Sequence, residues 1–348
     1  MPKTRLKELF EDELVELLRV QGVEKYRARQ ILEWVYGRGA TEFTEMTNLP
    51  MALREKLSQY LHVSNVNTLA KQVSQKDGTI KFLFELEDGH AVETVLLRHD
   101  YGNSVCVSTQ VGCARGCRFC ASTLGGLVRN LSAGEIIDQV LAVGKVLQEE
   151  NQRVGSIVIM GSGEPFDNYD NVLRFIRLLH LPYGLNIGYR HITLSTCGVV
   201  PGIDRLAEEE LPVTLSISLH APNDRLRSEL MPINVRYPIA ALVAASDRYA
   251  LKTKRRITYE YSLISKINDQ EEHARQLAAL LTGRLCHVNL IPINAVSECG
   301  YSQPSGVTIK QFQDILKARG IEVTVRKELG SDIDAACGQL RRRITSGD

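Results

Sequence analysis

The sequence predicts an α/β protein whose main part is an incomplete, laterally open β/α barrel of about six βα units. Three observations support this fold class. Short apolar runs alternate with helical stretches after residue 103, residues before 63 have helical periodicity, and the segment between them alternates apolar and polar residues. With 348 residues, 44% of them hydrophobic, the chain is long enough for one large domain and a smaller one.

Residues 1–62 are predicted to form a small helical accessory domain that binds RNA. Apolar residues recur at three- and four-residue spacing in "DELVELLRVQGV" and "YRARQILEWVYGRG". The basic residues between Lys25 and Arg38 either face a phosphate backbone or belong to a solvated helix face, and the sequence leaves both readings open.

Residues 63–102 are predicted to form a connecting β element with a hairpin. The stretch "TIKFLFELEDGHAVETVLLR" alternates apolar and polar residues on both sides of "EDGH". Two alternating runs separated by a short turn of this composition are typical of a β-hairpin.

Residues 103–340 are predicted to form the barrel. The expected strands are "SVCVSTQ", "SIVIMG", "HITLST", "VTLSISLH", "RITYEYSLI" and "CHVNLIPIN", with helices such as "SAGEIIDQVLAVGKVLQ" between them. This alternation indicates right-handed βαβ units and a parallel sheet. A complete barrel has eight such units, so an incomplete barrel fits better, and a doubly wound open sheet is the alternative. Residues 341–348, "RRRITSGD", form a basic C-terminal tail.

The charge and cysteine content limit the possible functions. Lys and Arg total 42 against 41 Asp and Glu, so any nucleic-acid contact must come from local basic patches. No apolar stretch is long enough for a membrane span, and the first residues lack the apolar core of a signal peptide, so we expect a cytoplasmic protein without membrane contacts. The eight cysteines then indicate metal or redox chemistry rather than a disulfide framework.

Three of these cysteines share one short segment, "GCARGCRFCAS", as Cys113, Cys117 and Cys120. A structural zinc site needs four ligands, and the alternative of zinc with Cys106 as the fourth would place one ligand inside a strand. A cubane iron–sulfur cluster held by three thiolates keeps an open position on its fourth iron, where a cofactor can bind. We therefore predict a reactive iron–sulfur cluster.

Polar or glycine residues follow successive predicted strands, where functional groups of a β/α barrel collect. These residues are Gly163, Glu164, Ser195, Ser218, His220 and Asn294. Each has a structural explanation by itself, such as a helix cap for Ser195 or a core histidine for His220. Their recurrence at consecutive strand ends favours one shared site.

Two later segments also contain candidates. Arg225, Arg227 and Arg236 lie beside Tyr237, and this combination suits stacking on single-stranded RNA, although ordinary surface arginines are an equal reading. Near the end, "GSDIDAACGQLRRR" contains Cys337, for which a buried structural cysteine is the default interpretation.

The spacing CxxxCxxC after the first barrel strand resembles that of the radical S-adenosylmethionine (radical SAM) superfamily. The chain as a whole resembles the RlmN family, dual-specificity adenine-C2 methyltransferases of 23S ribosomal RNA and transfer RNA. The matching stretches are "AVETVLL", "CVSTQVGCARGCRFCAS", "MGSGEP", "LSTCGVVPGI", "ISLHAPND", "MPIN", "HVNLIPIN" and "DIDAACGQL". Small departures occur at Ser162 and Cys197.

The resemblance implies a role for each matching residue. The metal ligands of a [4Fe–4S] cluster are Cys113, Cys117 and Cys120. The S-adenosylmethionine site contains Gly163, Glu164, Ser195, Ser218, Leu219, His220 and Asn294. Cys337 carries the methyl group, Cys106 forms a disulfide with it to release the product, and Glu93 accepts a proton.

The resemblance also implies two molecules of S-adenosylmethionine per turnover, an electron donor such as flavodoxin or ferredoxin, and 23S ribosomal RNA and transfer RNA as partners. Nothing in the sequence indicates more than a monomer. Methylation at adenine C8, as in antibiotic-resistance relatives of the Cfr type, is one alternative, and a non-catalytic, zinc-stabilised RNA-binding module is another.

Overall fold

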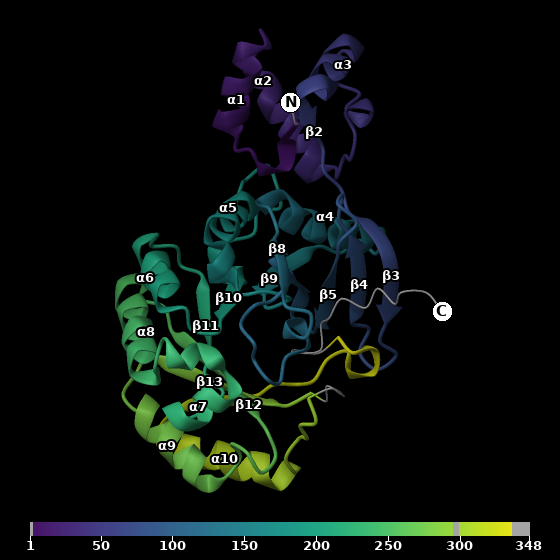
Figure 1. Ribbon diagram of the computed structural model, residues 1–348. Helices are drawn as coiled ribbons and strands as arrows, with labels where there is room; N and C mark the ends of the chain where they lie inside the picture. The colour runs from purple at the N-terminus through teal and green to yellow at the C-terminus, as the bar shows by residue number, and fades with distance from the viewer. Residues whose placement is uncertain (1–2, 295–298, 336–348) are drawn as a thin grey trace.

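The N-terminal part of the chain is helical. The computed structural model describes residues 3–294 and 299–335, so Cys337 and the basic tail 341–348 lie outside the described residues. The first elements are β1 (Thr4–Arg5), α1 (Glu11–Val20), α2 (Tyr26–Leu32), α3 (Met51–Tyr60) and β2 (Leu61–His62). Strand β1 pairs in parallel with β2, which brings the two ends of this part together. Figure 1 shows these elements at one end of the molecule, next to helices α4 and α5.

An antiparallel β element follows. Its strands are β3 (Asn67–Val73), β4 (Ile80–Glu85) and β5 (Ala91–His99), and β5 then pairs antiparallel with β6 (Gly102–Cys106). The turn between β4 and β5 contains the predicted "EDGH" segment, which confirms the hairpin expected from the sequence.

The barrel strands are β6, β9 (Val154–Ile159), β10 (Ile192–Thr196), β11 (Thr214–Ser218), β12 (Ile257–Leu263), β13 (Cys286–Pro292) and β14 (Glu322–Val325). The helices between them are α4 (Ala133–Glu149), α5 (Tyr169–Leu179), α6 (Val200–Glu208), α7 (Asp224–Leu230), α8 (Ile239–Thr253), α9 (Glu271–Leu281) and α10 (Gly306–Ala318). From β6 to β14 the strands run parallel in chain order, and in the described part of the chain β14 and β3 are the two edges of the sheet. The open, incomplete barrel is therefore confirmed, with β14 as a strand that the sequence reading missed.

Alternation along the barrel strands separates apolar from polar side chains. On β10 and β11, Leu194 and Ile217 are buried in the apolar core shared with the helices. Their neighbours Thr193 and Ser216, together with Thr258 on β12, line an internal cavity instead. Because strand side chains alternate between faces, polar residues at every second position leave the inside of the barrel polar while the helices cover an apolar outside.

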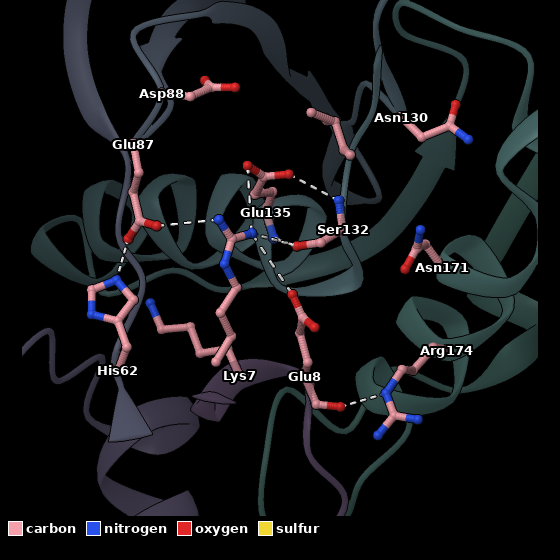
Figure 2. A network of polar contacts seen from close by, with 12 residues as sticks. Lys7, Glu8, His62, Glu87, Asp88, Asn130, Ser132, Glu135, Asn171 and Arg174 are labelled. Carbon is pink, nitrogen blue, oxygen red and sulfur yellow. Dashed lines mark hydrogen bonds and ion pairs between the residues drawn. The ribbon is translucent and has the colours of Figure 1, made fainter. Parts of the chain in front are cut away.

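A polar network joins the N-terminal part to the barrel (Figure 2). Lys7 donates a hydrogen bond to the side chain of Asp138 on α4. It also donates to the backbone oxygen of Ser64 at 2.5 Å. Both members of the ion pair are almost fully buried, and burial raises the pKa of Asp138 despite the adjacent ammonium. Arg5 donates to Ser132 at 2.9 Å and lies 3.5 Å from Glu135. The N-terminal part is thus attached to α4 by buried and half-buried charges.

None of the helices within residues 3–294 and 299–335 combines the length and the apolar character that crossing a bilayer requires.

Candidate active site

The three-cysteine segment is a loop between two short antiparallel strands, β7 (Gln110–Gly112) and β8 (Leu127–Asn130). Gly112 has a φ of +78°, and a Cβ at this position would lie 1.9 Å from the backbone oxygen of Gly126. The backbone N–H of Cys113 donates to that same oxygen at 3.1 Å. Only glycine fits this close approach, and the contact fixes where the first cysteine leaves the strand.

Cys113, Cys117 and Cys120 line one small cavity of about 160 Å³. Burial raises the pKa of Cys113 to about 11, and burial together with the other thiols raises the pKa of Cys117 as well. These thiols resist ionisation by themselves, so a bound cation must compensate the charge of their thiolates. Three soft sulfur ligands with no competing oxygen ligand among them fit an iron–sulfur cluster.

The described residues contain no group of three or more His, Cys, Asp or Glu side chains that could hold a single metal ion. A cluster with several irons takes each thiolate at a different iron, so its ligands need not converge on one point.

Glu164 follows β9 and faces the same cavity. Its carboxyl group is 3% exposed and accepts hydrogen bonds from the Thr196 hydroxyl at 2.8 Å, the Cys197 N–H at 2.7 Å and the Phe166 N–H at 3.0 Å. The Cys197 thiol also forms a hydrogen bond with this carboxyl group, so Glu164 is held firmly at the edge of the cavity. The preceding residue, Gly163, has a φ of +112°, and a Cβ there would lie 2.7 Å from side-chain atoms of residues 109 and 110.

The predicted residues after β10, β11 and β13 complete the cavity. Ser195 and Ser218 lie with their hydroxyl oxygens 3.5 Å apart, and His220 and Asn294 line the same space. Leu219 is fully buried, and among the described residues the lining does not include its side chain. The structure therefore brings together the three cysteines and every predicted cofactor-binding residue except the side chain of Leu219.

His220 is held in one tautomer. Its Nδ1 accepts from the backbone N–H of Ser262 at 2.9 Å, so in the neutral ring Nε2 carries the proton. Burial lowers the pKa of His220 to about 3, which keeps the ring neutral at physiological pH. Its φ of +56° is rare for a residue other than glycine, and Phe119 of the cysteine loop packs against its ring edge-on at 4.9 Å between centroids.

A larger cavity of about 1460 Å³ occupies the inside of the barrel, and Cys106 lines it. The residues that line both cavities are Met160, Glu260, Ile291, Asn294 and Arg326. Cys106 also packs with Val95, Leu97 and Ala335, the last residue that the structure describes before Cys337. The C-terminal end of the described chain therefore belongs to the same apolar cluster as Cys106 and lines the same cavity.

Glu93 lies on β5 in a third cavity of about 170 Å³, beside the cysteine loop. Its carboxyl group lies 3.4 Å from the ammonium of Lys81, which also donates to the backbone oxygen of Asp334 at 3.2 Å. Ser122 lines both this cavity and the small cysteine cavity. In the described structure Glu93 thus borders the cysteine site but does not line the cavity of Cys106, and Lys81 connects it to the C-terminal segment.

One expectation from the sequence is wrong. Arg227 is fully buried rather than available to RNA, whereas Arg225 and Arg236 are exposed. The Arg227 guanidinium donates to the backbone oxygens of Cys197 at 2.7 Å and of Leu219 at 3.2 Å. Burial lowers the pKa of Arg227 to about 10. Arg227 therefore holds the segments after β10 and β11 in place.

Two residues of the site were missed in the sequence. Thr196 donates to Glu164, and Glu260 lies in the wall between the small cysteine cavity and the larger cavity. A hydroxyl directly after Ser195 and a carboxyl at an inward position of "ITYEYSL" are the signals that could have indicated them.

Comparison with known proteins gives the family. Residues 107–278 match the radical SAM superfamily, and residues 4–63 match the ribosomal RNA large subunit methyltransferase N-terminal domain. The "Probable dual-specificity RNA methyltransferase RlmN" of Desulforamulus reducens is 56% identical over 344 residues, which cover 99% of this chain and 97% of that protein. The chain belongs to the RlmN family.

A second RlmN relative, from Geobacillus kaustophilus, is 56% identical over 95% of this chain and 91% of its own length. The crystal structure of a radical SAM methyltransferase from Sphaerobacter thermophilus matches with a TM-score of 0.94 and 50% identity, and covers 98% of this chain and 99% of its own. Membership in the RlmN family makes the protein a radical SAM methyltransferase and implies a [4Fe–4S] cluster and S-adenosylmethionine. The non-catalytic zinc module considered from the sequence is therefore wrong.

Proposed function

We propose that the protein methylates carbon 2 of an adenine in 23S ribosomal RNA and in transfer RNA. The RlmN relatives are described as probable dual-specificity RNA methyltransferases, and residues 4–63 match a domain of ribosomal RNA large-subunit methyltransferases. Carbon 2 lies between two ring nitrogens and is electron-poor, so it cannot act as the nucleophile of an ordinary methyl transfer. It can accept a carbon radical.

In this proposal the thiolates of Cys113, Cys117 and Cys120 would hold the cluster. S-adenosylmethionine is held by the backbone or side chains of Gly163, Glu164, Ser195, Ser218, Leu219, His220 and Asn294. When bound, S-adenosylmethionine would supply the methyl group and, after one-electron reduction through the cluster, a carbon-centred radical. Two molecules of S-adenosylmethionine would be consumed per turnover.

The remaining steps belong to side chains of the protein. Cys337 carries the methyl carbon on its sulfur and presents that carbon to C2 of the adenine. Glu93, or a group that it serves, accepts the C2 proton. Once the radical adduct has returned its unpaired electron to the redox centre, the Cys106 thiolate would attack the Cys337 sulfur. The bond between this sulfur and the transferred carbon then breaks with its electron pair left on the carbon, which takes up a proton to become the methyl group, and a Cys106–Cys337 disulfide remains to be reduced.

The placement of Cys106 and Ala335 in one apolar cluster and in the lining of one cavity supports this proposal. Cys337 follows Ala335 by two residues, which an extended chain spans in ~7 Å. A thiol that must attack Cys337 is expected at such a place. The link from Glu93 through Lys81 to Asp334 brings the proposed proton acceptor to the same C-terminal segment.

We further propose that residues 1–62 form the RNA-binding accessory domain, residues 63–102 the connecting β element, residues 103–340 the catalytic barrel and residues 341–348 a basic tail. The proposed setting is the cytoplasm, where ribosomal and transfer RNA are found. A flavodoxin or ferredoxin would supply the electron, and the protein would act as a monomer.

The test is an anaerobic reaction of the iron-reconstituted protein with S-adenosylmethionine, a reductant and unmodified ribosomal or transfer RNA. Digested RNA is then analysed by chromatography and mass spectrometry against 2-methyladenosine and 8-methyladenosine standards. We expect 2-methyladenosine from both RNAs. Formation of 8-methyladenosine would assign the alternative C8 reaction, and RNA that stays unmodified with an intact cluster would contradict the proposal.

A further inference from the structure

The proposed chemistry places the target base in the large cavity. Cys106 lines this cavity, and its attack on Cys337 requires both sulfurs and the transferred carbon to be close together. The three cluster cysteines line the small cavity instead. A base that reacts between these two sites must therefore lie against the wall that the cavities share.

This shared wall contains an acceptor suited to a base edge. Met160 and Ile291 offer apolar surface for the faces of a purine ring, and Glu260 is the carboxyl group of the wall. Glu260 points inward from the middle of β12, in register with Ser218 on β11 and Asn289 on β13. It is 5% exposed, so any group that binds to it does so inside the barrel.

The hydrogen bonds of Glu260 leave acceptor capacity. Among the described residues, Asn289 donates to one carboxylate oxygen at 2.8 Å and Ser216 donates to the other at 3.4 Å. An ionised carboxylate has about four acceptor positions, so two donors leave about half of them for a ligand. Burial raises the pKa of Glu260, and the positive charge of Arg326 opposes this rise. A further N–H donor from a ligand would therefore stabilise the ionised carboxyl group.

We propose that Glu260 recognises the target base by accepting a hydrogen bond from the exocyclic amine at position 6 of adenine. This inference rests on the proposed adenine methylation and adds a residue that selects the base. Adenine carries an N–H donor at position 6, whereas guanine and hypoxanthine carry a carbonyl oxygen there. A buried carboxylate attracts the donor and repels the carbonyl, so Glu260 would exclude 6-oxopurines from the cavity.

A purely structural role for Glu260 makes a different prediction. A carboxyl group that only holds β11 and β13 through Ser216 and Asn289 would, when changed, weaken the reaction with every base by the same factor. If Glu260 recognises the base, changing it should instead alter the ratio of affinities, and of kcat/KM values, between RNAs that carry different bases. Hypoxanthine is a useful comparison because, like adenine, it has a hydrogen at C2.

The experiment compares two RNA stem–loops that differ only in an unpaired adenine or hypoxanthine at the target position. The full-length protein, Glu260→Gln and Thr258→Val are each measured for RNA affinity by fluorescence anisotropy without S-adenosylmethionine, and for kcat/KM of methylation with the full system. A glutamine keeps the size of the side chain and can donate to a 6-carbonyl oxygen. Thr258 lies two residues earlier on the same inward face and serves as the matched control.

We expect the wild-type protein to prefer adenine, and Glu260→Gln to lower the adenine-to-hypoxanthine ratio by about 10- to 100-fold in both measurements, because hydrogen bonds to charged groups are worth ~1.5–3 kcal/mol. Thr258→Val should keep the wild-type ratio. An equal loss for both RNAs in Glu260→Gln, or wild-type binding that does not distinguish the two bases, would overturn the inference.

The two proposals fail in different ways. If wild-type protein forms no methylated adenosine, adenine methylation fails, while the anisotropy ratios still test base recognition by Glu260. If adenine is methylated and the ratio stays unchanged in Glu260→Gln, only the role of Glu260 fails.

Discussion

The buried ion pair between Lys7 and Asp138 gives a sharp prediction for how the N-terminal part is attached. The side chains of Lys7 and Asp138 are 3% and 1% exposed, so Lys7→Met would leave a buried carboxylate without its cation. Such a loss typically costs about 3–5 kcal/mol. Replacing both residues, as in Lys7→Met with Asp138→Leu, removes the unpaired charge and should recover most of that stability.

The assay uses the one tryptophan of the sequence, Trp34, which lies in the N-terminal part and packs against the apolar core. Its fluorescence reports the unfolding of this part in urea, while circular dichroism follows the barrel. With an m-value of at most about 3 kcal/mol per molar urea, a loss of about 3 kcal/mol lowers the midpoint by at least ~1 M. A shift below about 0.3 M for Lys7→Met, or a double variant as unstable as the single one, would refute this reasoning.

Three further predictions concern the site. Gly112→Ala should abolish iron binding after reconstitution, because the added Cβ would collide with the backbone of Gly126. Gly125 has open space around it, so Gly125→Ala should bind iron normally and serves as the control. Equal iron contents in the two variants would contradict the role of the loop geometry. Cys106→Ala should accumulate a covalent protein–RNA adduct visible on denaturing gels, with Cys286→Ala as a control that turns over normally; normal turnover of Cys106→Ala would remove Cys106 from the mechanism. Because burial depresses the pKa of His220 to about 3, the unfolded chain binds one more proton than the folded chain between pH 6.5 and 3. The free energy of unfolding should therefore fall by roughly 2 kcal/mol from pH 6.5 to 5, and a similar fall in His220→Asn would count against this cause.

The sequence predicts the fold well where the signal is local. The barrel strands from β6 to β13 were all expected from apolar runs between helices, and the β4–β5 hairpin from its turn residues. Strand β14 was missed because its residues are mostly exposed and only Val323 is buried, so it lacks the apolar run of a central strand. The pairing of β1 with β2 was also missed, since it joins two-residue strands more than fifty positions apart.

The residues of the candidate site also fall into two groups, those that the sequence predicts and those that only the structure reveals. The cysteine loop and the residues at strand ends follow from spacing and position, and the structure collects them in one cavity. Arg227 was misread because composition cannot show that a helix turns an arginine inward onto backbone oxygens. Glu260 was missed because it lies in the middle of a strand, and only the curvature of the sheet reveals that two cavities meet at it.

The cysteine loop is positioned by contacts that do not depend on a metal. On β8, Arg129 forms two hydrogen bonds of 2.8 Å to Glu135 on α4 and lowers the pKa of Asp88, in the β4–β5 turn, to about 2. Glu135 also lies 3.5 Å from Arg5 of the N-terminal part. In the proposed function, a loop that is already in place would favour binding of the cluster, because little conformational ordering would be left to oppose that binding. The charges that attach the N-terminal part to α4 thus also anchor the strand that closes the cysteine loop.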